Sequence, residues 1–229
     1  MEIRPEVPSD AEAISNVITA AFVGAEHSSG TEASIVEALR EARSLAVSLV
    51  AMEKESIVGH VAFSPVTIDG CSDGWFGLGP VAVVPRRQAQ GIGSALIEAG
   101  LASLRARGSN GCVVLGEPAY YSRFGFTADH SLRLAGVPPE YFQQLKFTEQ
   151  SCRGMVEYHA AFEISLCLVP PCVSPQRGHS QCSRAISDEC AFYPIGEIGP
   201  GDGSFPGDGG DGTSMSGEWV GIPGGGAVG

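Results

Sequence analysis

Basic side chains are scarce in this sequence. Its 229 residues include 14 lysines and arginines against 26 aspartates and glutamates, which gives a formal net charge of −12. No basic patch dominates, which argues against nucleic acid or an anionic membrane surface as a partner and mildly favours a small cationic one. The sequence has no run of about 18 apolar residues, so no membrane span is predicted. The N-terminal stretch MEIRPEVPSD lacks the basic and apolar regions of a secretory signal, and we therefore expect a cytoplasmic protein.

Cysteines and histidines with metal-ligand spacing are also missing. The seven cysteines form no CxxC motif, and the five histidines are scattered along the chain. A structural zinc site usually shows two such closely spaced pairs. We therefore expect reduced thiols and no metal.

Lysine is absent from the last part of the chain, where the composition changes. From Ser165 onward the sequence is rich in glycine, proline and serine, and the periodic apolar pattern ends near Pro170. Such a segment cannot bury enough surface to offset its ordering entropy. The sequence predicts a folded domain over residues 1–163 and a largely disordered tail over 164–229. A partner-binding segment, a linker remnant and a shifted reading frame are alternative explanations of this tail.

The first 163 residues alternate periodic apolar segments with short turns. Apolar residues three and four positions apart predict helices, and alternating or continuous apolar runs predict strands. The predicted helices cover residues 9–22, 31–42 and 91–107, with a short helix and turn at 118–126. The predicted strands cover residues 2–4, 44–53, 55–69, 76–85, 111–116 and 154–163, the last one closing the sheet. This order is typical of an α/β fold with a sheet of mixed strand directions.

A glycine-containing loop, QAQGIGS from Gln88 to Ser94, joins the strand at 76–85 to the helix at 91–107. A helix N-terminus offers unpaired N–H groups and the positive end of the helix dipole, and glycine lets an anion approach the backbone. The loop is neither a Walker A motif nor a dinucleotide-binding fingerprint, because the GK[ST] end and the third glycine are missing. The pattern indicates a phosphate site or, alternatively, close packing of helix on strand. The buried face of the helix is predicted to comprise Ile92, Leu96, Ala99 and Ala102.

The residues around this loop resemble the GCN5-related N-acetyltransferase (GNAT) superfamily. The stretch QAQGIG matches its Q/R-x-x-G-x-G/A signature, and LGPVAVVPRRQAQGIGSALIEAGL is similar to its motif A. The stretch GCVVLGEPAYYSRFGF is similar to motif B, whose Y-x-x-x-G-F ending fits residues 121–126. IRPEVPSDAEAI resembles the first strand and helix, and GMVEYHAAFE resembles the last strand of a bacterial subgroup of small acetyltransferases. The resemblance covers residues 1–163.

This resemblance implies a GNAT (acyl-CoA N-acyltransferase) fold, with a mixed central sheet flanked by helices. The strands LGPVAVV and CVVLG would run parallel and splay apart around acetyl-CoA, the acyl-donor substrate. The pantetheine arm is expected to pair with the backbone of Val81, Ala82 and Val83. The pyrophosphate is expected on the loop residues Gln88, Ala89, Gln90, Gly91, Ile92, Gly93 and Ser94. Arg86 and Arg87 would either add charge near the phosphates or be solvated.

The resemblance also assigns a proton donor. The motif B tyrosine, Tyr121 by spacing, is the expected general acid for the departing CoA thiolate. Its neighbour Tyr120 is the weaker candidate for this role. The alternative for Tyr121 is simple aromatic packing.

The sequence specifies the general base less well. Many family members carry a glutamate on the motif A strand, but here residues 77–79 are Gly-Leu-Gly. Glu117, directly after the strand at 111–116, is our candidate for a base or for binding a cationic substrate. Further candidates are Glu26, Glu32 and His60, although a hydrogen-bonded structural role is the more common one for a sheet histidine. Cys112 is a poor acyl carrier, because an apolar strand disfavours its thiolate.

We therefore expect an acetyl-CoA-dependent N-acetyltransferase that acetylates a small-molecule or protein amine by direct attack in a ternary complex. The alternative is a CoA-binding sensor or partner-binding module with weak catalysis. The acceptor cannot be read from the sequence. A homodimer is compatible with it, but the oligomeric state is open.

Overall fold

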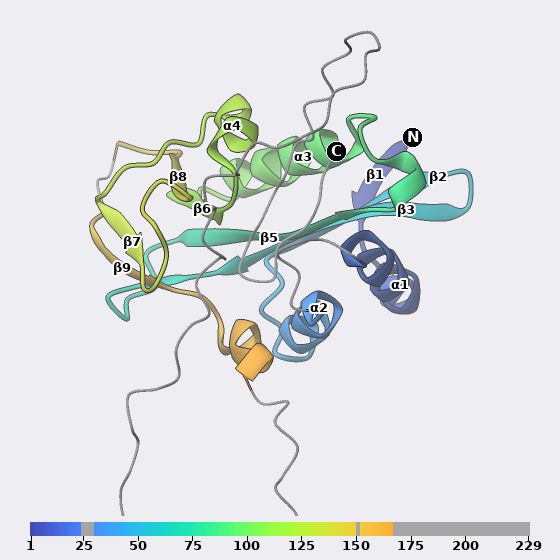
Figure 1. The fold of residues 1–229 in the computed structure, drawn as a ribbon, viewed down its shortest axis with the longest axis horizontal. Helices are drawn as coiled ribbons and strands as arrows, with labels where there is room; N and C mark the ends of the chain where they lie inside the picture. Colours follow the sequence, from blue (N-terminus) through green and yellow to red (C-terminus); the bar gives the residue numbers. More distant parts are fainter. Residues whose placement is uncertain (24–29, 150–151, 167–229) are drawn as a thin grey trace, which may run out of the picture.

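A six-stranded mixed sheet lies between two layers of helices in the computed structural model, which describes residues 1–23, 30–149 and 152–166 (Figure 1). The helices α3 and α4 cover one face of this sheet, and α1 and α2 cover the other. The α-helices are α1 (Ala11–Phe22), α2 (Glu32–Glu41), α3 (Ile92–Ala106) and α4 (Pro118–Tyr121). Short 3₁₀ helices are η1 (Pro8–Asp10), η2 (Pro85–Arg87), η3 (Ser122–Phe124) and η4 (Ala160–Leu166).

The main sheet has the strand order β1-β2-β3-β5-β6-β8. Its strands are β1 (Glu2–Pro5), β2 (Val47–Glu53), β3 (Ser56–Pro65), β5 (Trp75–Val83), β6 (Gly111–Leu115) and β8 (Phe142–Lys146). All neighbours in it are antiparallel except β5 and β6, which run parallel. This confirms the predicted mixed sheet and the parallel pair at its centre.

The parallel pairing of β5 with β6 stops after three residues. The register joins Trp75 to Gly111, Phe76 to Cys112 and Gly77 to Val113. Beyond these pairs no ladder joins residues 78–83 of β5 to residues 114–115 of β6 within the described chain. We call this divergence the β5–β6 fork. Strand splaying of this kind is what the resemblance implied.

The last predicted strand is shorter than expected and lies in a different sheet. Only β9 (Gly154–Glu157) forms from residues 154–163, and it pairs with β4 (Thr67–Ile68) and β7 (Leu132–Leu134) in a second, three-stranded sheet. The main sheet is closed instead by β8, a strand that the sequence pattern did not predict. Alternation indicates that a segment is a strand, but its partner depends on long-range register.

Two apolar layers form the core on the two faces of the sheet. On one face, α3 packs against β2, β3 and β5 through Ile92, Leu96, Ile97, Leu101 and Leu104. The predicted face of α3 was only partly right, because Ile92 and Leu96 are buried whereas Ala102 is exposed. On the other face, α1 packs through Ile14, Val17 and Ile18 against Val50, Ala62 and Ala82.

The predicted tail, residues 164–229, lies outside the described residues apart from the backbone of residues 164–166. These three residues belong to η4. Ala161 of the same helix packs against Ile35 and Leu39 of α2. The predicted domain boundary at residue 163 therefore falls inside η4.

Candidate active site

The loop between β5 and α3 contains two residues in the left-handed backbone region. Ala89 has φ +58° and Gly91, directly before α3, has φ +78°. A positive φ is uncommon for a residue with a side chain, and such residues cluster at functional sites. An ideal Cβ placed on Gly91 would meet no atom within 4 Å. The glycine is therefore required by its backbone angle, and the space beside it is open.

Two glutamine side chains of the loop form hydrogen bonds with backbone carbonyls of the preceding strand β5 and helix η2. The Gln88 Nε2 donates to the Val83 carbonyl at 3.1 Å, and the Gln90 Nε2 donates to the Arg86 carbonyl at 3.3 Å. The first intrahelical bond of α3 runs from the Ala95 N–H to the Gly91 carbonyl at 3.0 Å. The N–H groups of residues 92–94 precede this bond and have no intrahelical acceptor. The loop can therefore present several N–H groups to one anion at the positive end of α3.

The two arginines before the loop differ in their surroundings. Arg87 forms an ion pair with Glu53 at the end of β2, so its charge is directed toward that carboxylate. Arg86 is exposed and borders a hollow of about 400 Å³ together with Lys54 and Ser56 of the β2–β3 turn. Of the pair, Arg86 is the cation available to a bound phosphate.

The backbone of β5 alternates between its neighbour β3 and the fork. The Val84 N–H donates to a β3 carbonyl at 3.0 Å. Because hydrogen-bonded and non-hydrogen-bonded pairs alternate in an antiparallel ladder, the backbone groups of Ala82 also face β3. Those of Val81 and Val83 face away from β3, and the Gln88 amide that reaches the Val83 carbonyl agrees with this. Of the three predicted pantetheine-binding residues, Val81 and Val83 thus direct backbone groups toward the fork, whereas Ala82 does not.

Tyr121 ends α4 and is fully buried on the α3 face of the sheet. Its ring lies 5.1 Å from that of Tyr120 and 5.8 Å from that of Phe126. The Tyr121 hydroxyl has no hydrogen-bond partner among the described residues. Burial, together with the nearby phenols of Tyr120 and Tyr158 and the Cys112 thiol, raises the pKa of Tyr121 well above its usual range. The phenol therefore keeps its proton at neutral pH.

Glu117 and Tyr121 are brought together by the same short helix. Glu117 is the N-cap of α4, and its Oε1 accepts the Ala119 N–H at 3.4 Å. The Glu117 carbonyl also accepts the Tyr121 N–H at 3.1 Å. Glu117 thus lies at the carboxyl end of β6, where parallel neighbours leave room for a ligand. Tyr120 differs from Tyr121 in that its ring is covered by the Arg123 guanidinium, 4.4 Å from the ring centroid.

The other glutamate candidates for the base are not placed beside α4, and Cys112 is a buried thiol. Glu26 lies outside the described residues, and Glu32 is a buried residue at the start of α2, on the face opposite α4. Cys112 is buried within β6, and burial raises the pKa of its thiol, as expected for a residue that does not carry an acyl group.

His60 belongs to a buried polar network and not to the fork. Its Nε2 lies 2.9 Å from the Ser48 Oγ, and that hydroxyl donates to Glu6 at 2.6 Å. Glu6 also accepts two hydrogen bonds from the Arg40 guanidinium of α2, at 2.9 and 3.0 Å. Burial lowers the pKa of His60, so the ring is neutral in this network. The histidine is structural, joining β2, β3 and α2.

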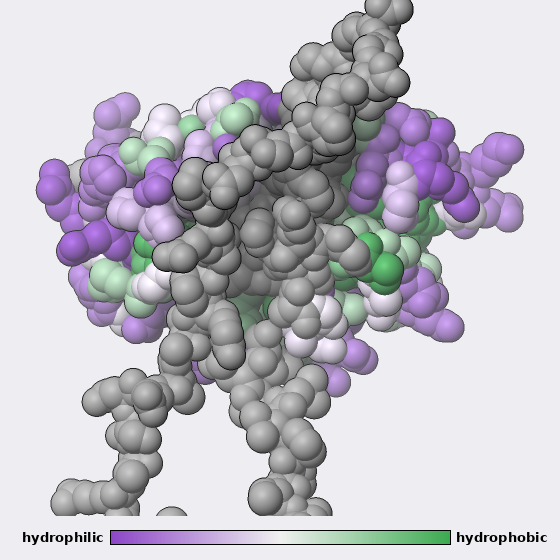
Figure 2. Space-filling view, viewed as in Figure 1, coloured by the Kyte–Doolittle hydropathy of each residue, from purple (hydrophilic) through white to green (hydrophobic). Residues whose placement is uncertain are grey.

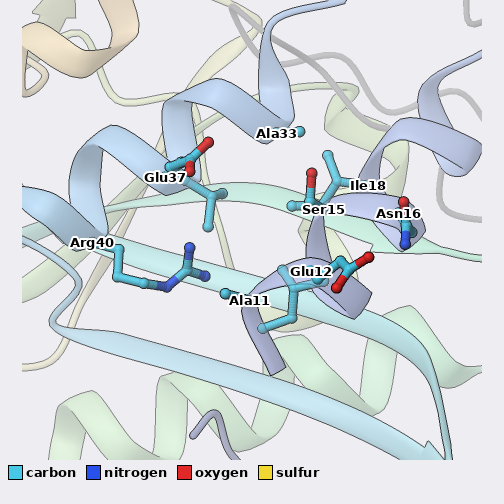
Figure 3. A pocket seen from close by; sticks show the side chains of 10 residues that line it. Ala11, Glu12, Ser15, Asn16, Ile18, Ala33, Glu37 and Arg40 are labelled. Carbon is cyan, nitrogen blue, oxygen red and sulfur yellow. The ribbon is translucent and has the colours of Figure 1, made fainter. Parts of the chain in front are cut away.

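A separate pocket of about 310 Å³ lies between α1 and α2 (Figure 3). Glu12, Ser15 and Asn16 of α1 and Glu37 of α2 line it, with Arg40 at one end. None of these residues belongs to the predicted site. In the view of Figure 2, hydrophilic residues predominate at both ends of the molecule, and hydrophobic ones are visible mainly in the region of α1.

One buried hydroxyl at the fork was missed by the sequence analysis. Tyr158, directly after β9, packs on Gly77 of β5, and its hydroxyl is buried. The alternating pattern of residues 154–163 marks Tyr158 as part of a strand-like segment, but no local signal indicates which strand it meets.

Among residues 1–23, 30–149 and 152–166, no group of three or more His, Cys, Asp or Glu side chains could hold a metal ion. No helix of the described chain is long and apolar enough to cross a membrane.

The chain is similar in sequence to known acetyltransferases. Residues 44–128 match the family model of the acetyltransferase (GNAT) domain. The chain is 39% identical over 169 residues to the uncharacterized N-acetyltransferase YhbS of Escherichia coli strain K12, a match that covers 71% of this chain and 98% of YhbS. It is 38% identical over 122 residues to the uncharacterized N-acetyltransferase YjhQ of the same strain, covering 52% of this chain and 65% of YjhQ.

Solved structures of similar chains share the architecture. A GNAT family acetyltransferase from Brucella melitensis in complex with acetyl-CoA is 50% identical, with a TM-score of 0.64, covering 70% of this chain and 97% of that one. The Escherichia coli YhbS structure in complex with CoA is 36% identical, with a TM-score of 0.65, covering 71% of this chain and 91% of that one.

Proposed function

The chain belongs to the GNAT family of acetyltransferases, and from this premise we propose that it transfers the acetyl group of acetyl-CoA to a primary amine by direct attack in a ternary complex. The observation that carries the proposal is the loop before α3. Its left-handed Gly91, the open space beside that residue and the N–H groups of residues 92–94 at the start of α3 suit a bound anion. The acetyl-CoA and CoA bound in the similar structures support the same ligand here.

The ligand would lie along the loop and the fork. The pyrophosphate would accept hydrogen bonds from the loop backbone, over residues 88–94, with Arg86 adding charge. The pantetheine amides would pair with the outward backbone groups of Val81 and Val83, as an added strand does. The thioester would then lie deeper in the fork, close to Tyr121.

The chemistry requires one bond to form and one to break. The neutral amine nitrogen attacks the thioester carbon, the C–N bond forms, and the C–S bond breaks. After the attack the nitrogen, now positively charged, loses a proton to solvent, and the leaving sulfur gains one from the Tyr121 phenol, which is later reprotonated from solvent. The Tyr121 phenol is protonated at neutral pH, since burial raises its pKa, and it can therefore donate a proton to the departing sulfur.

Glu117 is the carboxylate that we assign to the amine. It follows the carboxyl end of β6 as the N-cap of α4, the helix that ends with Tyr121. A carboxylate there would attract a cationic amine and accept its proton before attack, since a lysine-like amine has a pKa of about 10.4. Residues 77–79 of β5 carry no carboxylate that could replace it. This absence favours the alternative function, a CoA-binding module with weak catalysis.

The cytoplasmic location, the absence of a metal and a homodimer stay predictions.

Thermal unfolding with and without acetyl-CoA tests the proposal. A ligand that binds only the folded state stabilises it by about 2.7 kcal/mol at a hundredfold excess over Kd. We expect a clear rise in Tm for the wild type and none for Gly91→Glu, whose carboxylate would repel the pyrophosphate. The Glu12→Gln variant, altered in the α1–α2 pocket, should keep the wild-type response. No rise in the wild type would contradict the proposal, and binding without turnover of any primary amine would favour the sensor.

A further inference from the structure

Gly77 is the last residue of β5 that pairs with β6, and an aromatic ring lies directly on it. An ideal Cβ at Gly77 would be 2.3 Å from the Tyr158 Cε1 and 3.1 Å from the Val66 Cγ1. No side chain can be accommodated at such a distance without moving the ring. The Tyr158 ring thus fills the space that a side chain of β5 would occupy at the start of the fork.

The hydroxyl of Tyr158 is buried and has no hydrogen-bond partner within the described residues. Its ring is held from behind by Phe162 of η4, with the ring centroids 5.0 Å apart. Burial raises the pKa of Tyr158, so the hydroxyl is a proton donor at neutral pH. A buried hydroxyl without an acceptor is costly to keep, and such groups are often completed by a ligand.

A second unpartnered hydroxyl lies beside this ring. Ser64 of β3 is directly opposite Gly77 in the ladder, is fully buried, and its Oγ has no partner in the described chain. Directly opposed residues of an antiparallel pair point to the same face, about 5 Å apart at Cβ. Ser64 and Tyr158 therefore belong to one polar spot on the face of the sheet covered by α2 and η4.

The two phenols approach the fork from opposite faces. Tyr121 packs in the core cluster of α3, whereas Tyr158 packs between Gly77 of the sheet and Phe162 of η4, the helix that contacts α2. Tyr121 shares its core cluster with Cys112 of β6, whereas the Tyr158 ring lies on Gly77 of β5. Cys112 pairs with Phe76, the neighbour of Gly77, so the two tyrosines flank the strand pair from which the fork begins.

We propose that Tyr158 is a binding residue for the acetyl group, donating a hydrogen bond from its hydroxyl to the thioester carbonyl oxygen from the face opposite Tyr121. The inference rests on the proposed function, because it requires acetyl-CoA in the fork. The carbonyl oxygen is the one acceptor that acetyl-CoA has and CoA lacks at this end of the molecule. Tyr158 thus supplies a side-chain donor at a position where Gly77 of β5 has no side chain.

The affinities of CoA and acetyl-CoA for Tyr158→Phe, measured by isothermal titration calorimetry, test the inference. Loss of one neutral hydrogen bond should weaken acetyl-CoA binding about three- to tenfold. CoA binding should be unchanged, which makes CoA the internal control for a disturbed fold. The Tm of the free variant should not fall, because the removed oxygen has no partner. Tyr141→Phe is the matched control, since Tyr141 precedes β8 on the far side of β6 from the fork, and it should leave both affinities unchanged.

A second variant keeps the hydroxyl but moves it. Gly77→Ala pushes the Tyr158 ring away from β5 and should lower the affinity for acetyl-CoA relative to CoA as Tyr158→Phe does. Equal affinities of wild type and Tyr158→Phe for acetyl-CoA, or equal loss for both ligands, would overturn the inference while leaving the proposed function intact. Failure of the wild type to bind either ligand would instead contradict the proposed function.

Discussion

At the residue scale, the phenol of Tyr121 is held among aromatic rings with no partner for its hydroxyl. Packing alone would be served equally well by phenylalanine, and the motif Y-x-x-x-G-F carries the oxygen nonetheless. A buried donor kept at a cost is typical of a site that is completed by substrate. The same reasoning applies to Tyr158 on the opposite face.

Tyr121→Phe should lower the catalytic rate without lowering the affinity for CoA. Loss of the proton donor should reduce kcat about 100- to 10,000-fold, with the amine that the wild type acetylates best. The Tm and the affinity for CoA should stay at the wild-type level, because the hydroxyl makes no hydrogen bond in the free protein. Steady-state kinetics and calorimetry measure the two effects. An unchanged kcat would leave Tyr121 with a packing role only.

At the element scale, α2 contacts the sheet through a network of polar side chains as well as through apolar packing. The Glu6 carboxylate, directly after β1, accepts from Arg40 of α2 and from Ser48 of β2. Burial alone would raise the pKa of Glu6, but the nearby His60 and the hydrogen bonds from Arg40 and Ser48 outweigh it and hold the pKa well below 4.5. The charged form is therefore favoured in the folded protein.

Glu6→Gln should make the protein less stable at neutral pH and less sensitive to acid. Since the folded-state pKa of Glu6 is depressed, its contribution is complete above pH 4.5 and is lost as the pH falls below that value. The variant should lose about 1–3 kcal/mol of unfolding free energy at pH 7, because the Arg40 charge loses its partner. Urea unfolding at neutral pH and near pH 3 measures this. Glu2→Gln, at an exposed carboxylate of β1, is the matched control and should change neither value.

If Glu6→Gln lowered the free energy of unfolding equally at both pH values, the Glu6 network would not contribute to the loss of stability in acid. His60 acts with the same sign, because its lowered pKa makes protonation more favourable in the unfolded chain. The remaining acid sensitivity of Glu6→Gln should therefore appear below pH 6.5.

At the scale of the whole molecule, the described chain forms one α/β domain whose last helix packs back on α2. Ala161 of η4 is buried against Ile35 and Leu39, and Phe162 holds the Tyr158 ring. Residues 160–162 are thus part of the domain and of its proposed site. We propose that the domain ends close to Leu166 and that the glycine- and proline-rich segment beyond it is dispensable for folding.

Limited proteolysis with a nonspecific protease tests this boundary. Because the composition after Pro170 cannot build a core, cleavage should leave a fragment that ends close after Leu166, identified by intact-mass measurement. Acetyl-CoA should still raise the Tm of that fragment. A chain cut at residue 163, inside η4, should be less stable than one cut after Leu166. Resistance of the whole chain to protease would contradict the proposal.

The sequence by itself determined the features that depend on local chemistry. The loop signature, the helix that follows it, the apolar strand at 111–116 and the turn at Gly125 are properties of short segments, whose backbone angles and periodicity depend on the residues within them. Motifs A and B supplied the fold, because their spacing places a known pair of parallel strands beside one loop. Tyr121 was predicted from motif B and Glu117 from its place directly after the strand at 111–116, and both stay predictions.

Only the tertiary structure decided which distant segments meet. Alternation could not show that β9 leaves the main sheet, that β8 closes it, or that Ala102 is exposed while Leu101 and Leu104 are buried. Nor could it place Tyr158 on Gly77, 81 residues away in sequence, or His60 within the network of Glu6 and Arg40. Such contacts depend on register and packing over the whole chain, where many pairings satisfy the same local pattern and the complete core selects one.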